Sequence, residues 1–153
     1  MDDKALLWHL YEDNRAQAQF HETQRVNGTG LIGGGAAVII STISQSGSYT
    51  REDLPLAAIL IVIGIFGFFF CVKSYERMQL HLNRCREFLN ILDEMDTSHD
   101  IIKIKNLADS KTKNEFKFAS RLKLRLFWQG VHVLIGLSGI LFSIRIILHQ
   151  FYP

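Results

Sequence analysis

Three long stretches of this sequence contain no charged side chain, although charged residues make up 21% of its 153 residues. They are Val26–Thr50, Leu54–Val72 and Leu126–Ile144, of 25, 19 and 19 residues. About 20 consecutive apolar residues are needed to cross a bilayer as a helix. This distribution excludes a soluble globular enzyme and predicts a small membrane protein that crosses the bilayer more than once.

Proline and cysteine are also scarce, and acidic residues are missing from the predicted membrane spans. Pro55 and Pro153 are the only prolines, so no proline breaks a helix between them. Cys71 and Cys85 stand fourteen residues apart on one predicted helix. At 1.5 Å per residue they are roughly 21 Å apart, too far for a disulfide within a chain. No Asp or Glu lies in the uncharged stretches, which leaves a carboxylate-based proton-coupled transporter without an obvious coupling group.

The three stretches differ in strength. Leu54–Val72 has no polar side chain, and Leu126–Ile144 is interrupted only by a few polar side chains such as Gln129 and His132. Val26–Thr50 is weaker, because its apolar core is only 13 residues long. It is either a re-entrant segment or the first arm of a membrane hairpin. Its short linker to the next span, residues 44–53, favours a full crossing.

The basic residues predict the orientation. The stretch 73–125 holds twelve of the seventeen Lys and Arg residues, and an excess of basic charge stays in the cytoplasm. We therefore expect an all-α, multi-pass membrane protein with a cytoplasmic N-terminus and an outer C-terminus. Its predicted parts are an N-terminal cytoplasmic amphipathic helix (1–25), a transmembrane hairpin (26–72), a cytoplasmic helical region (73–125) and a third transmembrane helix with the outer C-terminus (126–153).

Beyond the second span, apolar residues recur at alternating steps of three and four, which is typical of a coiled-coil seam. The seam residues are Tyr75, Met78, Leu82, Cys85, Leu89 and Leu92. One helix of about 40 residues, roughly 60 Å long, is predicted over 56–95. Its seam needs a cover, either from the N-terminal helix (Leu6, Leu7, Leu10, Phe20), from the following segment or from a second copy.

The segment after this stalk allows two structures. Residues 97–100 form a plausible helix start, and Ile101, Ile104 and Ala108 suit a helix over 101–120. The alternation at residues 102–105 also suits a short strand. A helix is the expected structure, because the chain must return to the third span.

Glycines crowd the first span. Gly28, Gly30 and Gly33 match G-x-G-x-x-G, but a dinucleotide site needs a strand before the glycines. Here a charged helix precedes them and a membrane span follows. Small residues that allow close helix approach explain them better, and Gly30 with Gly34 forms a G-x-x-x-G pair. The second span carries a similar face at Ala57, Gly64 and Gly67.

The third span has a continuous polar and small face. At 100° per residue, six positions fall within about 80° of one another. They are Arg125, Gln129, His132, Gly136, Gly139 and Ser143. Ionisable groups in a membrane face protein or water, because exposure to lipid is costly. Either this stripe packs against the other helices, or copies around an axis line an aqueous path with it.

An enzyme signature also needs weighing. Some helical ribonucleases carry an Arg followed by a His a few residues later, and Arg15–His21 and Arg125–His132 resemble that spacing. His132 lies in a membrane span, where RNA cannot reach it, so only Arg15 and His21 remain. No Ser-His-Asp grouping, metal cluster or phosphate loop is present, and no cofactor or metal is expected.

Two strings carry a resemblance to known families. They are WHLYEDNRAQAQFHETQRVNGTGLI and VKSYERMQLHLNRCREF, which stand before and after the hairpin. The chain resembles small bacterial membrane proteins found with antiphage systems: the two-transmembrane SLATT effectors, RipA-like octameric membrane proteins and a pore-forming accessory of type VI CRISPR systems. The third span departs from the SLATT pattern. The resemblance implies ring-like homo-oligomers, a central channel and membrane depolarisation or growth arrest during infection.

Together these patterns predict a homo-oligomeric inner-membrane pore or ion channel, not an enzyme, that perturbs the membrane when triggered. The expected partners are further copies (four or more, with eight favoured by the resemblance) and membrane lipids. The basic region 73–125 is expected to meet either an anionic trigger, such as a nucleotide, RNA or a protein, or anionic headgroups; no DNA is expected. The alternatives are a non-conducting membrane anchor that recruits a cytoplasmic partner, and a membrane-tethered ribonuclease.

Overall fold

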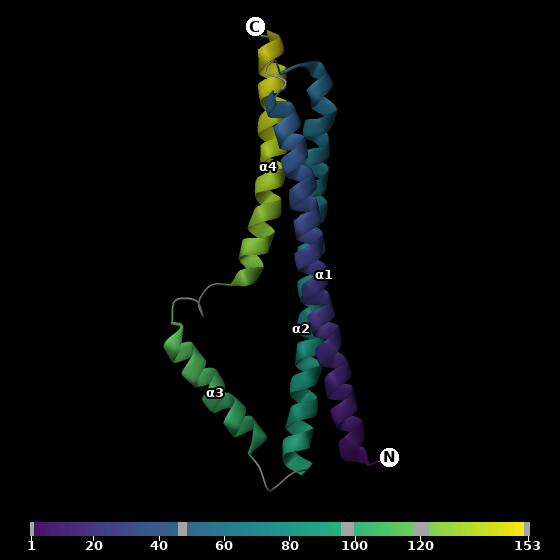
Figure 1. Cartoon of the computed structure of the whole chain (residues 1–153), viewed down its shortest axis with the longest axis vertical. Coiled ribbons are helices and arrows are strands. Elements are labelled where there is room, and N and C mark those ends of the chain that lie inside the picture. The colour runs from purple at the N-terminus through teal and green to yellow at the C-terminus, as the bar shows by residue number, and fades with distance from the viewer. Residues whose placement is uncertain (1, 46–48, 96–99, 118–122, 152–153) are drawn as a thin grey trace. The chain divides into compact units, whose positions relative to one another are not determined.

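The computed structural model describes residues 2–45, 49–95, 100–117 and 123–151, and these residues form helices without any β-strand. The elements are α1 (Asp3–Gln45), the one-turn 3₁₀ helix η1 (Arg51–Asp53), α2 (Leu54–Met95), α3 (Ile101–Glu115) and α4 (Leu124–Phe151) (Figure 1). The predicted all-helical fold is confirmed.

Three of these helices, α1, α2 and α4, are long and apolar enough to span a membrane. α2 and α4 contain the second and third uncharged stretches and α1 contains residues 26–45 of the first, so the predicted number of membrane-length helices is confirmed. The first stretch does not begin a new helix, because the 43-residue α1 starts at Asp3 and continues unbroken into it as far as Gln45. Its glycines are tolerated because a helix satisfies its own backbone hydrogen bonds, which is decisive in lipid.

The predicted long stalk helix and the helix after it are also present. The 42 residues of α2 include the expected range 56–95. The segment after the stalk forms a helix, α3, and not the alternative strand. The first two N–H groups of α3, those of Ile101 and Ile102, donate to Oδ1 of Asp93 at 2.7 and 3.3 Å. Asp100 directly precedes α3, while residues 97–99 of the expected helix start lie outside the described residues.

The chain divides into two compact units, and α1 and α2 each contribute to both. Unit 1 comprises residues 1–23 and 75–123, and unit 2 comprises residues 24–74 and 124–153. These boundaries fall two residues from the predicted ones at 25/26, 72/73 and 125/126. The composition shift between charged and uncharged sequence therefore coincides with the division of contacts in the fold.

Unit 2 is a bundle of α1, α2 and α4 with an aliphatic core. The buried core residues are Ala36, Ile43, Ala57, Leu60, Ile135 and Ile146. Residues 50–53, which precede α2, are held by hydrogen bonds, one of which reaches the C-terminal end of α4. The Thr50 N–H donates to Asp53 Oδ2 at 3.0 Å, and Arg51 Nε donates to Gln150 Oε1 at 2.7 Å.

Unit 1 pairs the first half of α1 with the second half of α2. Ala18, Cys85 and Leu92 are buried between them. α3 joins this unit by its first turn, where Ile101 and Ile102 are half-buried. Residues 103–117 are exposed.

Candidate functional site

His132 on α4 is the centre of a polar cluster inside unit 2. Its side chain is 0% exposed. Its Nε2 lies 3.2 Å from Oγ1 of Thr29 on α1, and the same hydroxyl lies 3.4 Å from Sγ of Cys71 on α2. The three polar side chains come from three different helices. The cluster therefore fixes the register of α1, α2 and α4 against one another.

The second ring nitrogen of His132 has no hydrogen-bond partner among the described residues. A neutral imidazole carries one N–H, which either donates from Nε2 to Thr29 or sits on Nδ1 while Thr29 donates to Nε2. Both tautomers leave Nδ1 unpaired, at a cost of about 1–3 kcal/mol. Close packing around the ring must therefore hold His132 in place.

Glycines provide that packing, because they let the backbones of α2 and α4 touch. A Cβ at Gly67 would overlap the His132 ring. A Cβ at Gly64 would lie 2.6 Å from the backbone nitrogen of Gly136, and one at Gly139 would lie 2.7 Å from the backbone oxygen of Ala57. Any larger residue at these positions would push the two helices apart.

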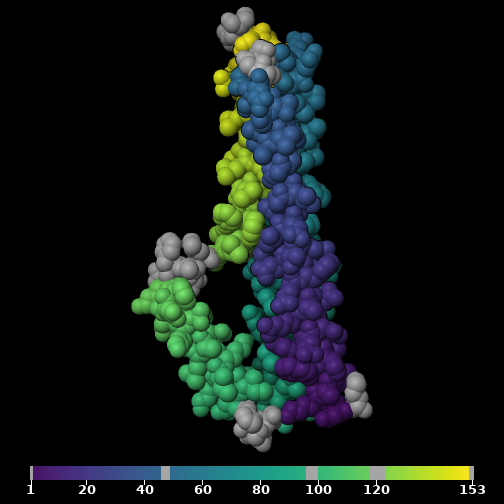
Figure 2. Space-filling view, in the orientation of Figure 1, coloured from purple at the N-terminus to yellow at the C-terminus, as the bar shows by residue number. Residues whose placement is uncertain are grey.

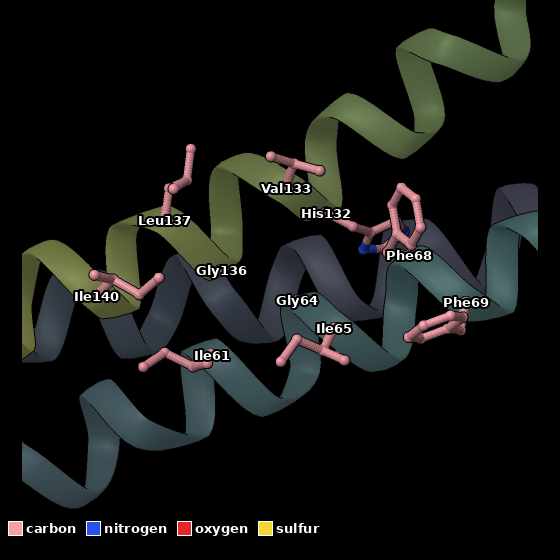
Figure 3. A pocket seen from close by; sticks show the side chains of 10 residues that line it. All are labelled: Ile61, Gly64, Ile65, Phe68, Phe69, His132, Val133, Gly136, Leu137 and Ile140. Carbon is pink, nitrogen blue, oxygen red and sulfur yellow. The ribbon is translucent and has the colours of Figure 1, made fainter.

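A cavity of about 300 Å³ lies beside this contact, between α2 and α4. Figure 3 shows His132 and Phe68 at one end of it and Ile61 and Ile140 at the other. Its remaining walls are aliphatic or aromatic, with backbone at Gly64. This cavity suits hydrocarbon and offers a polar ligand almost no partner.

The residues of the predicted third-span stripe differ in their burial along α4. Arg125 is exposed, Gln129 and Gly136 are half-buried, and His132 and Gly139 are buried. Ser143 is half-buried, and its hydroxyl donates to the Gly139 carbonyl of its own helix at 2.9 Å. In a single chain the central part of this stripe faces α1 and α2.

The predicted helix-packing glycines fall into two groups. Ala57, Gly64 and Gly67 of α2 are buried against α4. Gly30 and Gly34 of α1 are exposed, and a Cβ built on either would meet no atom within 4 Å. Within one chain, only the α2 group is in contact with another helix.

The exposed face of α1 carries polar as well as small side chains. From the sequence, only the glycine pair Gly30 and Gly34 was expected there. Five of its exposed residues fall within about 60° of one another at 100° per residue. They are Asn27, Gly30, Gly34, Ser41 and Gln45, which together we call the α1 polar face, and the exposed side chains of Leu31 and Val38 border it. Gln45 Nε2 donates to Ser41 Oγ at 2.7 Å along this face.

The other two membrane-length helices expose a different kind of surface. Apart from Arg145, the large exposed side chains between residues 54 and 72 of α2 and between 133 and 148 of α4 are Leu, Ile, Val or Phe. Such faces suit lipid. The α1 polar face is thus the exception in unit 2, and Figure 2 shows α1 (purple to blue) uncovered on the side facing the viewer.

In unit 1 the stalk seam packs against α1. Cys85 and Leu92 are buried and Tyr75, Met78, Leu82 and Leu89 are half-buried. The Cys85 thiol donates to the Tyr11 carbonyl at 3.5 Å, and burial raises the pKa of this thiol. The N-terminal helix supplies this cover through the face of Leu7, Tyr11 and Ala18, which are half-buried or buried. Among the side chains expected there, Leu7 is half-buried, whereas Leu6, Leu10 and Phe20 are exposed.

Of the two candidate ribonuclease residues, Arg15 lines a cavity of about 240 Å³ between α1 and α2, and His21 does not line it. Arg15 instead donates from a guanidinium nitrogen to the Tyr11 hydroxyl at 3.0 Å. His21 stacks on His81 with ring centroids 5.6 Å apart.

His81 lies at the junction of α1 and α2 in unit 1. Its Nδ1 lies 2.9 Å from Oδ1 of Asn14, and since a carbonyl oxygen only accepts, the neutral ring carries its proton on Nδ1. Burial lowers the pKa of His81 below its ordinary value of 6.5, and nearby His21, Arg84 and Arg77 act in the same direction. These surroundings favour the neutral form of the ring.

Among the residues that the structure describes, no three His, Cys, Asp or Glu side chains are grouped closely enough to hold a metal ion. In the comparisons with known proteins, no family model, curated protein or solved structure matches this chain.

Proposed function

We propose that this protein is a homo-oligomeric pore of the bacterial inner membrane, in which α1 of each copy faces the central axis. The observation that carries the proposal is the α1 polar face. It lies on a membrane-length helix and is uncovered in the single chain. Polar groups in the bilayer face protein or water rather than lipid.

The exposed side chains of α2 and α4 differ from those of α1, and this difference indicates which helix of each copy faces the axis. Their exposed Leu, Ile, Val and Phe side chains are suited to hydrocarbon, so these helices form the outer, lipid-facing wall. Gly30 and Gly34 allow α1 helices of neighbouring copies to approach closely. Asn27, Ser41 and Gln45 then supply hydrogen-bonding groups toward the axis.

In this arrangement the His132 cluster is internal to each copy. It holds α4 against α1 and α2, so we infer that the third-span stripe packs against these helices and does not line an aqueous path. The resemblance to antiphage membrane proteins, with its ring-like assemblies, supports the proposal that the pore depolarises the membrane when triggered. The excess of basic residues in 73–125 supports a cytoplasmic N-terminus and an outer C-terminus.

The first test is the mass of the purified complex, corrected for detergent. We expect a ring of four or more copies, because fewer copies place too few helices around an axis to enclose water. Gly34→Leu should break the ring into smaller species while leaving the helix content unchanged. The matched control is Ala58→Leu, which introduces the same leucine side chain at an exposed position of α2. Equal assembly of both variants would contradict the proposed interface.

The second test asks whether the axis conducts. In a planar bilayer under a salt gradient, Asn27→Asp should shift the reversal potential toward cation selectivity and Asn27→Lys toward anion selectivity. His132→Leu should leave the conductance of an assembled ring unchanged. A lowered conductance in that variant would instead indicate that the α4 stripe lines the aqueous path.

A non-conducting membrane scaffold is the second candidate function, and the dry packing of His132 favours it. On this hypothesis the α1 polar face still joins copies, but their helices meet without a path between them. An assembled ring that shows no ion flux in liposomes, with or without the Asn27 variants, would identify the scaffold.

A further inference from the structure

We propose that α3 docks on the first half of α1 in a neighbouring copy of this chain, so that each copy both supplies a basic helix and receives one. The inference rests on the homo-oligomer of the proposed function, but it does not depend on whether that assembly conducts. Its basis is the uncovered surface of α3, the acidic outer side of α1 and the match between the two in charge, spacing and length.

Most of the surface of α3 is uncovered within the chain. None of its 15 residues is buried, and from Lys103 onward every residue is exposed. Ile104 and Leu107 are 62% and 63% exposed. They lie on one side of the helix because they are three residues apart, and Lys111 and Glu115 continue that side by one and two turns. This side of α3 therefore combines apolar and charged groups, as a helix does that packs against another helix in water.

The first half of α1 has an outer side that points away from α2. Leu7, Tyr11 and Ala18 face the seam of α2, and the residues on the opposite side of α1 are exposed. Six of these residues fall within about 120° of one another at 100° per residue, and we call them the α1 acidic face. They are Leu6, His9, Glu12, Asp13, Ala16 and Phe20. The nearest basic residues, Lys4 and Arg15, lie outside this face.

The charges of the two surfaces are complementary. Residues 101–117 contain five lysines but only one aspartate and one glutamate, whereas the α1 acidic face holds two carboxylates and no lysine or arginine. Complementary charge favours the correct partner and disfavours like-charged ones. Two α1 acidic faces would therefore repel each other, and a basic helix suits this surface better. A polyanion such as RNA would pair with the lysines but would leave Ile104 and Leu107 uncovered.

The spacing of the side chains allows several contacts to form at once. Asp13 and Phe20 are seven residues apart, or about two helical turns, and so are Lys111 and Ile104. In an antiparallel pair, Lys111 meets Asp13 where Ile104 meets Phe20.

The remaining charge on this side of α3 and the lengths of the two surfaces fit the same arrangement. Glu115 lies four residues beyond Lys111, so in the antiparallel pair it meets His9, four residues before Asp13. The 15 residues of α3 extend about 22 Å, and Leu6 to Phe20 extend about 21 Å, at 1.5 Å per residue. A parallel pair would place Glu115 beside Gln17 instead, so we infer the antiparallel direction.

A second copy is the occupant that leaves the fold of each chain unchanged. Within one chain both surfaces are exposed, while the first turn of α3 is held by Asp93 of α2. A contact between α3 of one copy and α1 of the next joins two different surfaces. Such a head-to-tail contact produces a ring when the rotation between copies closes. The docking is thus of the kind that the proposed assembly requires.

The test mixes two forms of the full chain that differ in the length of a peptide tag. One form carries Phe20→Cys and the other carries Ile104→Cys, and the purified complex is oxidised mildly. The matched control replaces Ile104→Cys with Asn106→Cys, which lies two residues further along and on the opposite side of α3. The native Cys71 and Cys85 are buried, and the unsubstituted chain measures their background.

We expect at least fivefold more mixed disulfide dimer with Ile104→Cys than with Asn106→Cys. Lys111→Glu added to the Ile104→Cys form should lower the yield at least threefold, because it places a second carboxylate opposite Asp13. Asp13→Lys added to the Phe20→Cys form should then restore the yield. Failure of this charge exchange to restore it would contradict the docking geometry.

Equal yields at the two positions would overturn the proposal, as expected if the lysines of α3 instead bind a polyanion or remain solvated. With both cysteines in one form, a disulfide that forms only within a copy would overturn it too, because α3 would then cover its own α1. The mass of the same complex separates this inference from the proposed function. A ring of four or more copies without the mixed disulfide refutes the docking alone, whereas a mixed disulfide in a species no larger than a dimer supports the docking and refutes the ring.

Discussion

The contact between Gly64 and Gly136 offers the sharpest prediction about unit 2. In Gly64→Ala, the new Cβ would lie 2.6 Å from the Gly136 backbone nitrogen, 2.7 Å from its Cα and 2.9 Å from the His132 carbonyl oxygen. Ordinary contact begins at 3.4 Å, so α2 and α4 must separate by about 0.8 Å. All three neighbouring atoms belong to the backbone, and no flexible side chain can move aside.

The magnitude follows from this geometry. Forcing one extra methyl group into a close-packed interior costs about 1–3 kcal/mol. Alanine also favours a helix over glycine by up to about 1 kcal/mol in water, which offsets part of that loss. We therefore expect Gly64→Ala to lower the free energy of unfolding by about 1–2 kcal/mol. This corresponds to about a tenfold change in the ratio of folded to unfolded protein.

The assay is an unfolding titration of the chain in bicelles, with helix content and compactness followed together. Gly130→Ala is the matched control, because a Cβ at that position of α4 would meet no atom within 4 Å. It should be neutral or slightly stabilising. If both variants lose the same stability, or if Gly64→Ala loses none, then α2 and α4 do not touch along the glycine face and the reasoning fails.

Three further outcomes are expected. Thr29→Val removes the hydroxyl beside His132 Nε2 and should lower the free energy of unfolding by about 1–3 kcal/mol in the same titration, whereas Thr29→Ser should retain most of it. A histidine whose pKa is lowered on folding binds protons less tightly when folded, so lowering the pH below about 6.5 should destabilise unit 1, and His81→Gln should flatten that dependence in thermal unfolding. Asp93→Ala leaves the N–H groups of Ile101 and Ile102 without their acceptor and should accelerate hydrogen exchange at these two amides, by a factor set by a lost cap of about 0.5–2 kcal/mol.

Much of the fold could be predicted from the sequence, because membrane helices are specified by local properties. Length and the absence of charge identify Leu54–Val72 and Leu126–Ile144 without any tertiary information. The seven-residue repeat from Tyr75 to Leu92 indicates a helix and marks the side that packs. These signals depend only on residue type and spacing, and the structure contains the corresponding helices.

The choice of partner for each helix face could not be predicted in this way. The seam of α2 is covered by α1 through Leu7, Tyr11 and Ala18, while Leu6 and Leu10 stay exposed. A helix with apolar residues on several sides gives no local sign of which side will meet a neighbour. That is decided by the residues that fit between two backbones, and it becomes visible only in three dimensions.

The same limit explains the two polar faces of unit 2. From the sequence, the stripe containing His132 stands out because histidine is rare in a membrane span, whereas the glycines of α1 suggest packing alone. In the folded chain, His132 is enclosed by Thr29, Cys71 and Gly67, and one of its two ring nitrogens is paired within one copy. Asn27 and Gln45 are less conspicuous in the sequence but remain uncovered. In the proposed pore this face meets a second copy or water, because a bilayer disfavours polar groups that one chain leaves exposed.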